Sequence, residues 1–310
     1  MKNKRFICII LLVASIVLPL GAQVVEDANE VTKMPLEKKE SLFSWSASAL
    51  VTSNYIWRGL YVGGPSVQLD ATVSYAGLFA NVWWNIGAGD WTFSSLKPEV
   101  DVAIGFSRWG LSVYYLHCFY FDRYADGTMS RFFDFRNNTQ GGTTGEWRVI
   151  YNRPVYTNKR GWTTSVNGLC AVRTFSRDGY YAEARGEEAK GEEVWKRAYS
   201  TYIEVGVDQT WGQDWSLAAR LGITPAKSIY TFYKGDFAVA LVGLKLNKGW
   251  VLGERREARG DEAMRRAGRL DAFVHVMLQP WQVNKDNLIL PISEAGGQKL
   301  NVAVGLRWSI

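Results

Sequence analysis

The sequence has little cysteine and, beyond its N-terminal segment, no long apolar run. Its 310 residues include 3 cysteines. Cys8 lies in the N-terminal apolar segment, whereas Cys118 and Cys170 each fall inside a predicted strand, which favours two free or lipid-facing thiols over a disulfide. No segment after residue 22 has the ~20 apolar residues that a membrane-spanning helix needs. These absences leave no membrane-spanning helix after residue 22 and at most one disulfide.

The sequence also lacks a large excess of charge of one sign. The formal net charge is +6, and Lys2, Lys4 and Arg5 at the N-terminus contribute three of these charges. The chain has no basic stripe interleaved with aromatic residues, which is the pattern typical of nucleic-acid binding. We therefore expect no nucleic-acid partner.

The N-terminus has the layout of a secretory signal peptide. Three basic residues precede an apolar run from Phe6 to Leu20, and the small residues Gly21 and Ala22 offer a cleavage point. We predict a signal peptide at residues 1–22 and a flexible polar leader at residues 23–42. Residues 43–310 show no break in composition and are predicted to form one domain.

Alternation of apolar and polar residues is the strongest positive feature. From Ser66 to Tyr75 the chain reads SVQLDATVSY, which puts valine, leucine, alanine and tyrosine on one face of a strand and polar residues on the other. The pattern fits a soluble sandwich or a membrane barrel, in which the polar face lines a lumen. An aromatic content of 14%, with 14 tryptophans, favours the barrel, because its two girdles at the lipid headgroups need amphipathic rings.

The connections between the predicted strands alternate between tight turns and long polar loops. The strands are expected at residues 43–55, 66–75, 78–87, 98–108, 111–121, 146–155, 162–173, 199–209, 215–223, 236–246, 269–279 and 299–309. Tight turns and long loops on opposite rims are typical of outer-membrane barrels, and a sandwich gives no reason for them. We predict an all-β, twelve-stranded, antiparallel up-and-down transmembrane β-barrel at residues 43–310, with both termini and the leader in the periplasm. A charged insert at about 250–268 would lie on the same side.

The last predicted strand carries a second signal. Its apolar residues alternate without a break up to the C-terminal Ile310. Gly305, Trp308 and Ile310 resemble the C-terminal recognition pattern of outer-membrane proteins, although a terminal phenylalanine is more usual. The resemblance implies the outer-membrane assembly machinery as a partner.

The end of the first strand carries a short motif. Residues 53–59 read SNYIWRG, which resembles the hallmark of the TorF-like porins of Gram-negative bacteria, a tyrosine followed after two residues by arginine and glycine. The family pattern falls on Tyr55, Arg58 and Gly59 and implies an outer-membrane barrel with channel activity. The residues alone also allow an aromatic belt with Arg58 reaching lipid headgroups or lipopolysaccharide.

The polar residues of the strands share one phase, which predicts an enclosed polar lumen. A cation facing lipid at mid-depth would cost about 2–4 kcal/mol, so a consistent phase favours the inward side. The predicted lumen-lining residues are Asp70, Asn81, Trp83, Glu99, Asp101, Arg148, Tyr202, Glu204, Asp208, Arg220, Asp271, His275, Asn301 and Arg307. Twelve strands enclose a narrow space, so most of these charges are expected to pair with one another.

The chain has 2 histidines, which leaves little scope for catalysis. Some barrels of this size hydrolyse lipids with a histidine that accepts a serine proton. His117 lacks the His-x-Ser-Asn-Gly type of context found there, and His275 alternates inward. Phe273 and Met277 flank His275 at the positions where a metal ligand would be expected. We predict no catalytic residue, no metal site and no cofactor.

These features together predict a porin in the outer membrane of a Gram-negative bacterium. Small polar solutes would diffuse through it passively, and outer-membrane lipids and lipopolysaccharide would surround it. Two alternatives are a plugged structural or adhesive barrel that acts through its surface loops, and a lipid-hydrolysing enzyme.

Overall fold

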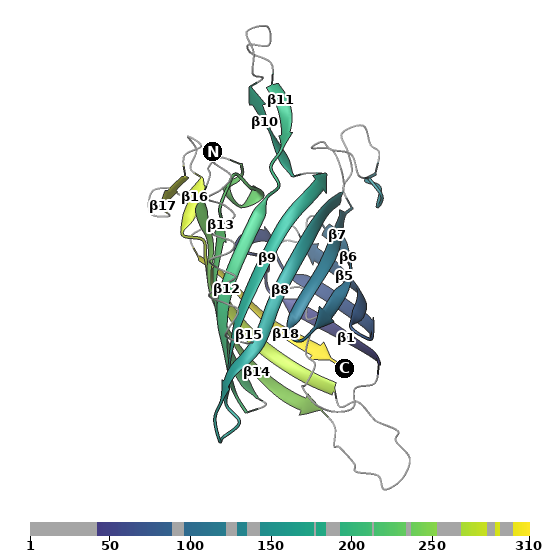
Figure 1. The fold of residues 1–310 in the computed structure, drawn as a ribbon, viewed down its shortest axis with the longest axis vertical. Helices are drawn as coiled ribbons and strands as arrows, with labels where there is room; N and C mark the ends of the chain where they lie inside the picture. The colour runs from purple at the N-terminus through teal and green to yellow at the C-terminus, as the bar shows by residue number, and fades with distance from the viewer. Residues whose placement is uncertain are drawn as a thin grey trace.

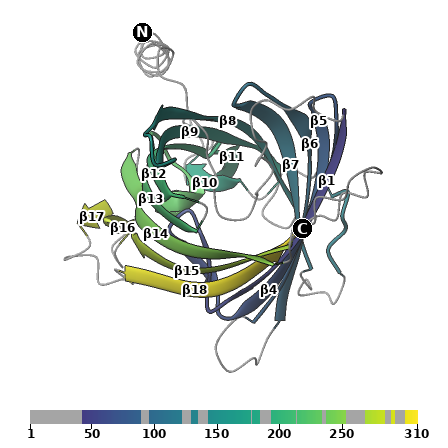
Figure 2. The ribbon, with the colours of Figure 1, turned by 90° about the horizontal axis from the view of Figure 1, so that it is seen from below.

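The chain folds into a single closed ring of antiparallel strands, seen from the side in Figure 1 and from one end in Figure 2. The structure is a computed structural model. It describes residues 42–88, 96–121, 129–134, 143–176, 178–183, 193–212, 214–233, 237–252, 268–283, 289–291 and 300–310. The predicted signal peptide, almost all of the predicted leader and residues 253–267 of the predicted insert lie outside the described residues.

Twelve strands form the barrel, and each pairs with its neighbour along the chain except where a hairpin interrupts the order. They are β1 (Phe43–Thr52), β4 (Ser66–Tyr75), β5 (Leu78–Ala88), β6 (Leu96–Arg108), β7 (Leu111–Tyr120), β8 (Thr143–Thr157), β9 (Thr163–Ser176), β12 (Thr201–Trp211), β13 (Trp215–Thr224), β14 (Ala238–Leu252), β15 (Gly268–Leu278) and β18 (Leu300–Ser309). Pairing of β1 with β18 closes the ring. The predicted twelve-stranded meander is confirmed, with shifts of a few residues at strand ends.

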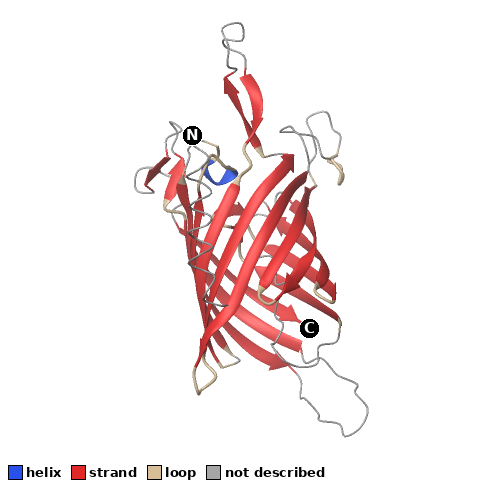
Figure 3. Ribbon diagram, viewed as in Figure 1, coloured by secondary structure: helices blue, strands red, loops and turns tan. Residues whose placement is uncertain are grey.

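Three short hairpins lie within the long connections and were not predicted. They are β2 (Tyr55–Trp57) with β3 (Leu60–Gly63), β10 (Gly179–Glu183) with β11 (Glu193–Arg197), and β16 (Trp281–Val283) with β17 (Ile289–Pro291). One 3-10 turn, η2 (Ile229–Thr231), follows β13. Figure 3 shows this turn as the only helical segment among the described residues. Within the same ranges, no helix is both long and apolar enough to cross a membrane.

The exposure of side chains along the strands separates a membrane barrel from a soluble sandwich. On β4 the apolar residues Val67, Leu69 and Val73 are exposed, whereas Gln68 and Thr72 are buried in the interior. β18 follows the same phase. In a soluble sandwich the apolar face would be covered instead. An apolar exterior around a polar interior is the inverse arrangement and suits hydrocarbon.

The two rims of the barrel differ as predicted. On the lower rim in Figure 1, β4 joins β5 through Ala76 and Gly77, and β6 joins β7 through Trp109 and Gly110. All four residues have positive φ, as a two-residue type I′ hairpin turn requires. Apart from the link between β14 and β15, of which residues 253–267 lie outside the described residues, the longer connections lie on the opposite rim. β1 begins and β18 ends on the short-turn rim, since the two strands pair antiparallel.

Exposed aromatic rings gather near the short-turn rim. They lie within a few residues of the turns or strand ends there: Trp45, Tyr75, Trp109, Tyr156, Trp162, Trp215, Trp250 and Trp308. Several carry a basic group against the ring, such as Arg108 over Trp109 and Lys248 over Trp215. Amphipathic rings with cations beside them suit the headgroup level of a bilayer. The predicted aromatic girdle is therefore present at this rim.

Candidate functional site

The motif of residues 55–59 forms a hairpin that enters the barrel. β2 and β3 pair across Arg58 and Gly59, whose φ angles are +48° and +84°. A Cβ at Gly59 would lie 2.5 Å from the carbonyl oxygen of Ala240 on β14, so the turn can approach the wall only with glycine there. Asn301 on β18 donates to the Gly59 carbonyl oxygen at 3.0 Å. The turn is thus held against the inner wall from two sides.

Arg58 extends from this turn to the opposite part of the wall. Its guanidinium donates from both terminal nitrogens to the Glu146 carboxylate on β8, at 2.9 Å each. It lies 4.8 Å from the Trp57 ring centroid and 4.7 Å from that of Tyr202. Arg58 is buried, so the alternative in which it reaches lipid headgroups is wrong. The bidentate ion pair instead joins the hairpin to β8 inside the barrel.

Glu146 is the centre of a basic cluster. Besides Arg58, the side chains of Arg148 on β8 and Arg173 on β9 form ion pairs with its carboxylate. All four residues are buried. Three guanidinium groups around one carboxylate leave an excess of positive charge at this level of the interior. Removing Glu146 would leave buried cations without their shared partner, which is costly.

A second inward segment meets the hairpin. Tyr230 lies in η2, between β13 and β14, and its hydroxyl accepts a hydrogen bond from Arg58 at 2.7 Å. Its ring stacks on Trp57 at 5.4 Å and packs against Tyr202 at 5.0 Å. Burial raises the pKa of Tyr230 to about 12, so the hydroxyl stays protonated at neutral pH. Two loops of the long-loop rim therefore meet inside the barrel.

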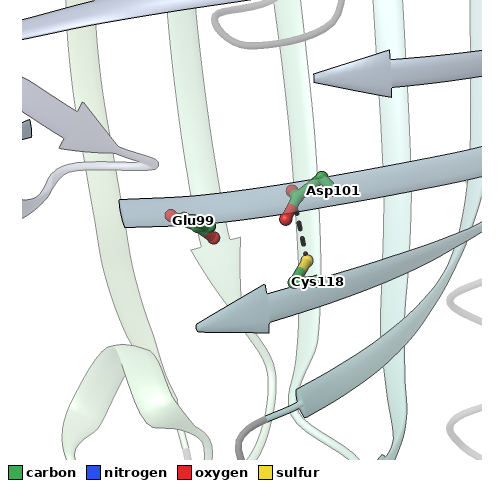
Figure 4. Close-up of side chains that lie close together, drawn as sticks. All are labelled: Glu99, Asp101 and Cys118. Carbon is green, nitrogen blue, oxygen red and sulfur yellow. Dashed lines mark hydrogen bonds between the residues drawn. The ribbon is translucent and has the colours of Figure 1, made fainter. Parts of the chain in front are cut away.

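Acidic side chains lie on the neighbouring wall. The hydroxyl of Tyr55 donates to the Glu99 carboxylate on β6 at 3.0 Å, and its ring packs against Trp83 on β5. Asp101 follows on the same face of β6, and the Cys118 thiol on β7 donates to it at 3.2 Å. Figure 4 shows Glu99, Asp101 and Cys118 gathered on one face of the two strands. One ligand atom of each lies within 4.8 Å of the others.

The remaining predicted lumen residues also lie on the interior face. Arg220 on β13 pairs with Glu204 and Asp208 on β12, and the Tyr202 hydroxyl donates to Glu204 at 2.5 Å. Asn81 donates to Asp70 at 2.8 Å. Asp271 forms an ion pair with Arg269. His275 is buried on β15, and Arg307 is half-buried on β18. The wall is thus lined by paired charges along much of its height.

Two residues of the basic cluster, Glu146 and Arg173, were not predicted. Glu146 lies two residues before Arg148 on β8 and so shares its face. Arg173 is in phase with Ser165 and Asn167 on β9, which are also buried. The alternation could have found both residues. The contact of Arg58 with them could not have been found this way, because it joins a loop to the wall.

The two histidines lie on different faces of the wall. A ring nitrogen of His117 is 2.8 Å from the Phe132 carbonyl oxygen, and its ring packs against Phe132 and Phe175. By the alternation of β7, His117 points away from the interior, where Tyr114 and Leu116 lie. His275 is buried on the inner face of β15. Both cysteines among the described residues are free, with Cys118 buried and Cys170 exposed.

Comparison with known proteins adds little. No protein-family model matches the chain, and no curated protein matches it. An outer-membrane channel of Pseudomonas putida F1 is 9% identical over 92% of this chain and 99% of that chain, with a TM-score of 0.42. The β-domain of the Bordetella autotransporter BrkA is 12% identical over 87% and 98%, with a TM-score of 0.35. OmpT, an outer-membrane protein of Vibrio cholerae, is 9% identical over 88% and 99%, with a TM-score of 0.29. All three TM-scores lie below 0.5.

The chain's own structure defines the class of protein. Twelve antiparallel strands close into a ring without free edges, the exterior of the wall is apolar and the interior is polar and charged. Closure satisfies every backbone group between strands, which is what crossing a bilayer with strands requires. The protein is an outer-membrane β-barrel.

Proposed function

We propose that this barrel is a channel for small polar solutes, constricted by the hairpin of β2 and β3. The observation that carries the proposal is the inner wall, where buried ion pairs line the interior: Arg220 pairs with Glu204 and Asp208, and Glu146 pairs with three arginines. A solely structural barrel could fill its interior with apolar side chains at lower desolvation cost. Resemblance of residues 55–59 to the TorF-like porins supports the same function.

The hairpin would set the width of the channel. It is held by Arg58 on Glu146, by Tyr55 on Glu99 and by Asn301 on Gly59. These contacts reach three different sectors of the wall, so the hairpin crosses the interior rather than lining one side. Solutes that pass would have to be small and polar.

Conductance across a planar bilayer tests this proposal. We expect small discrete steps from the wild-type barrel, and larger steps from Arg58→Asn, because the turn keeps a residue that tolerates positive φ but loses its anchor. Arg160→Asn, at an exposed turn on the opposite rim, is the matched control and should leave the steps unchanged. No steps from either wild type or Arg58→Asn would refute the channel.

A plugged barrel that acts through its surface loops is the second candidate. The burial of Arg58 and Tyr230, and their meeting inside the barrel, favour it. The conductance measurement separates the two candidates, because a plugged barrel would conduct neither as the wild type nor as Arg58→Asn. A catalytic role forms no part of the proposal.

We also propose an orientation in the membrane and the partners of the barrel there. The short-turn rim, with both ends of the barrel, would face the periplasm, and the long loops would face the cell surface. Lipids and lipopolysaccharide would contact the apolar exterior. Assembly machinery would read Gly305 and Trp308 on the closing strand and Ile310 directly after it. Ile310 exchanges backbone hydrogen bonds with Ala47.

A further inference from the structure

The group formed by Glu99, Asp101 and Cys118 is a different feature from the basic cluster and carries a different chemistry. Strand pairing sets it up: Asp101 lies directly opposite Cys118, and Glu99 lies two residues before Asp101 on the same face of β6. All three side chains are more than nine-tenths buried. Trp83, directly opposite Asp101 on β5, and Tyr55 of the hairpin cover the group.

The two carboxylates lack a basic partner within ion-pair distance. In the part of the chain that the structure describes, Arg58, Arg148 and Arg173 all pair with Glu146, and no ion pair reaches Glu99 or Asp101. Two buried carboxylates so close together repel each other when both are charged. A cation between them would remove that cost.

One oxygen of Asp101 points to the position of such a cation. Its Oδ2 accepts the hydrogen bond from Cys118, but its Oδ1 is buried and has no hydrogen-bond partner. A buried carboxylate oxygen without a donor costs free energy and calls for a ligand. The unsatisfied oxygen belongs to a group whose ligand atoms already lie within 4.8 Å of one another.

We propose that Glu99, Asp101 and Cys118 bind a divalent transition-metal ion of the zinc class on the inner wall of the barrel. Two oxygens and one sulfur suit such an ion, whereas calcium and magnesium take six or more oxygen ligands. Three protein ligands leave a fourth tetrahedral position for water or a solute. On binding, the Cys118 thiol releases to solvent the proton that it now donates to Asp101, and the metal–sulfur bond replaces that hydrogen bond.

Titration of the purified, folded barrel with Co²⁺ tests the site. We expect a thiolate-to-cobalt charge-transfer band and its displacement by Zn²⁺. Cys118→Ser should abolish the band, and Asp101→Asn should weaken binding by about tenfold or more. Cys170→Ser is the matched control: it removes the other thiol of the barrel, which is exposed on β9, two strands along the ring from β7, and should leave the band intact.

Zinc analysis of the wild-type barrel gives a second readout that needs no variant. After exposure to Zn²⁺ and removal of excess metal, we expect one zinc per chain. A wild-type barrel that retains no zinc and gives no cobalt band would overturn the proposal, as would a band that persists in Cys118→Ser. Either result is independent of whether the barrel conducts.

Discussion

Three turns of this barrel share one backbone conformation but differ in role. Ala76–Gly77 and Trp109–Gly110 join wall strands at the short-turn rim, and Arg58–Gly59 joins β2 to β3 inside the barrel. In each, a non-glycine residue with φ near +50° precedes a glycine with φ above +80°. The Trp109 side chain is 75% exposed, whereas Arg58 is 6% exposed. The same local geometry therefore serves as a surface turn in one place and as an interior anchor in another.

The turns differ in the residues that they contact. At the short-turn rim each turn contacts the next strand of the wall: the Gly77 carbonyl oxygen accepts a hydrogen bond from the Ser107 N–H on β6, and that of Gly110 accepts one from the Asn152 N–H on β8. Arg58 instead contacts Glu146 and Tyr230, which lie far along the chain on two other parts of the fold. Local sequence decides that a turn forms, and contacts between distant residues decide what it does.

The largest expected effect comes from removing the acceptor of the interior anchor. Glu146→Ala leaves three buried guanidinium groups without their shared carboxylate, and we expect it to lower the free energy of unfolding by about 3–5 kcal/mol. Urea titration in phospholipid vesicles, followed by tryptophan fluorescence, measures the change. Asp214→Ala breaks the exposed pair with Lys248 and should cost less than about 1 kcal/mol. Equal losses would show that the interior cluster does not anchor the hairpin.

The wall could be predicted from the sequence because its pattern is local. The bounds of β4 match the prediction, and its exposed face is the one that alternation indicates. The pairing of Asp101 with Cys118 also follows from a local feature, since the two-residue turn at Trp109–Gly110 fixes the register of β6 against β7. A ligand pattern centred on histidine does not include this pair.

The interior contacts could not be predicted, because the alternation of residues along a strand does not show which part of the wall a loop contacts. Tyr230 lies in a loop without alternation, and nothing in its neighbourhood indicates that it meets Arg58. Glu146 and Arg173 share the inward phase of their strands, but phase alone does not say which charge pairs with which. These contacts depend on how far each loop folds into the barrel, which strand patterns do not encode.

Asparagine placed at the same position of two turns tests whether these turns differ in role. Asparagine tolerates positive φ, so Arg58→Asn keeps the turn and removes only the interior contacts, at an expected loss of about 1.5–3 kcal/mol. Ala76→Asn relieves a residue that disfavours positive φ and should raise the free energy of unfolding by up to about 1 kcal/mol. The same urea titration measures both. Opposite signs are the expected result, and a loss at both positions would mean that the turns do not differ as described.

The smallest difference between two matched variants separates backbone conformation from close approach. Gly59 and Gly161 both have positive φ, at +84° and +75°, but a Cβ at Gly161 would meet nothing within 4 Å. Changing either to alanine carries the shared cost of a left-handed conformation, about 1–2 kcal/mol. Gly59→Ala also forces the turn away from Ala240, which adds about 1–3 kcal/mol as for other overpacked sites. Unfolding of the two variants side by side gives this difference directly. If it vanished, the hairpin would have room to move away from the wall, and its approach to β14 would not hold it in place.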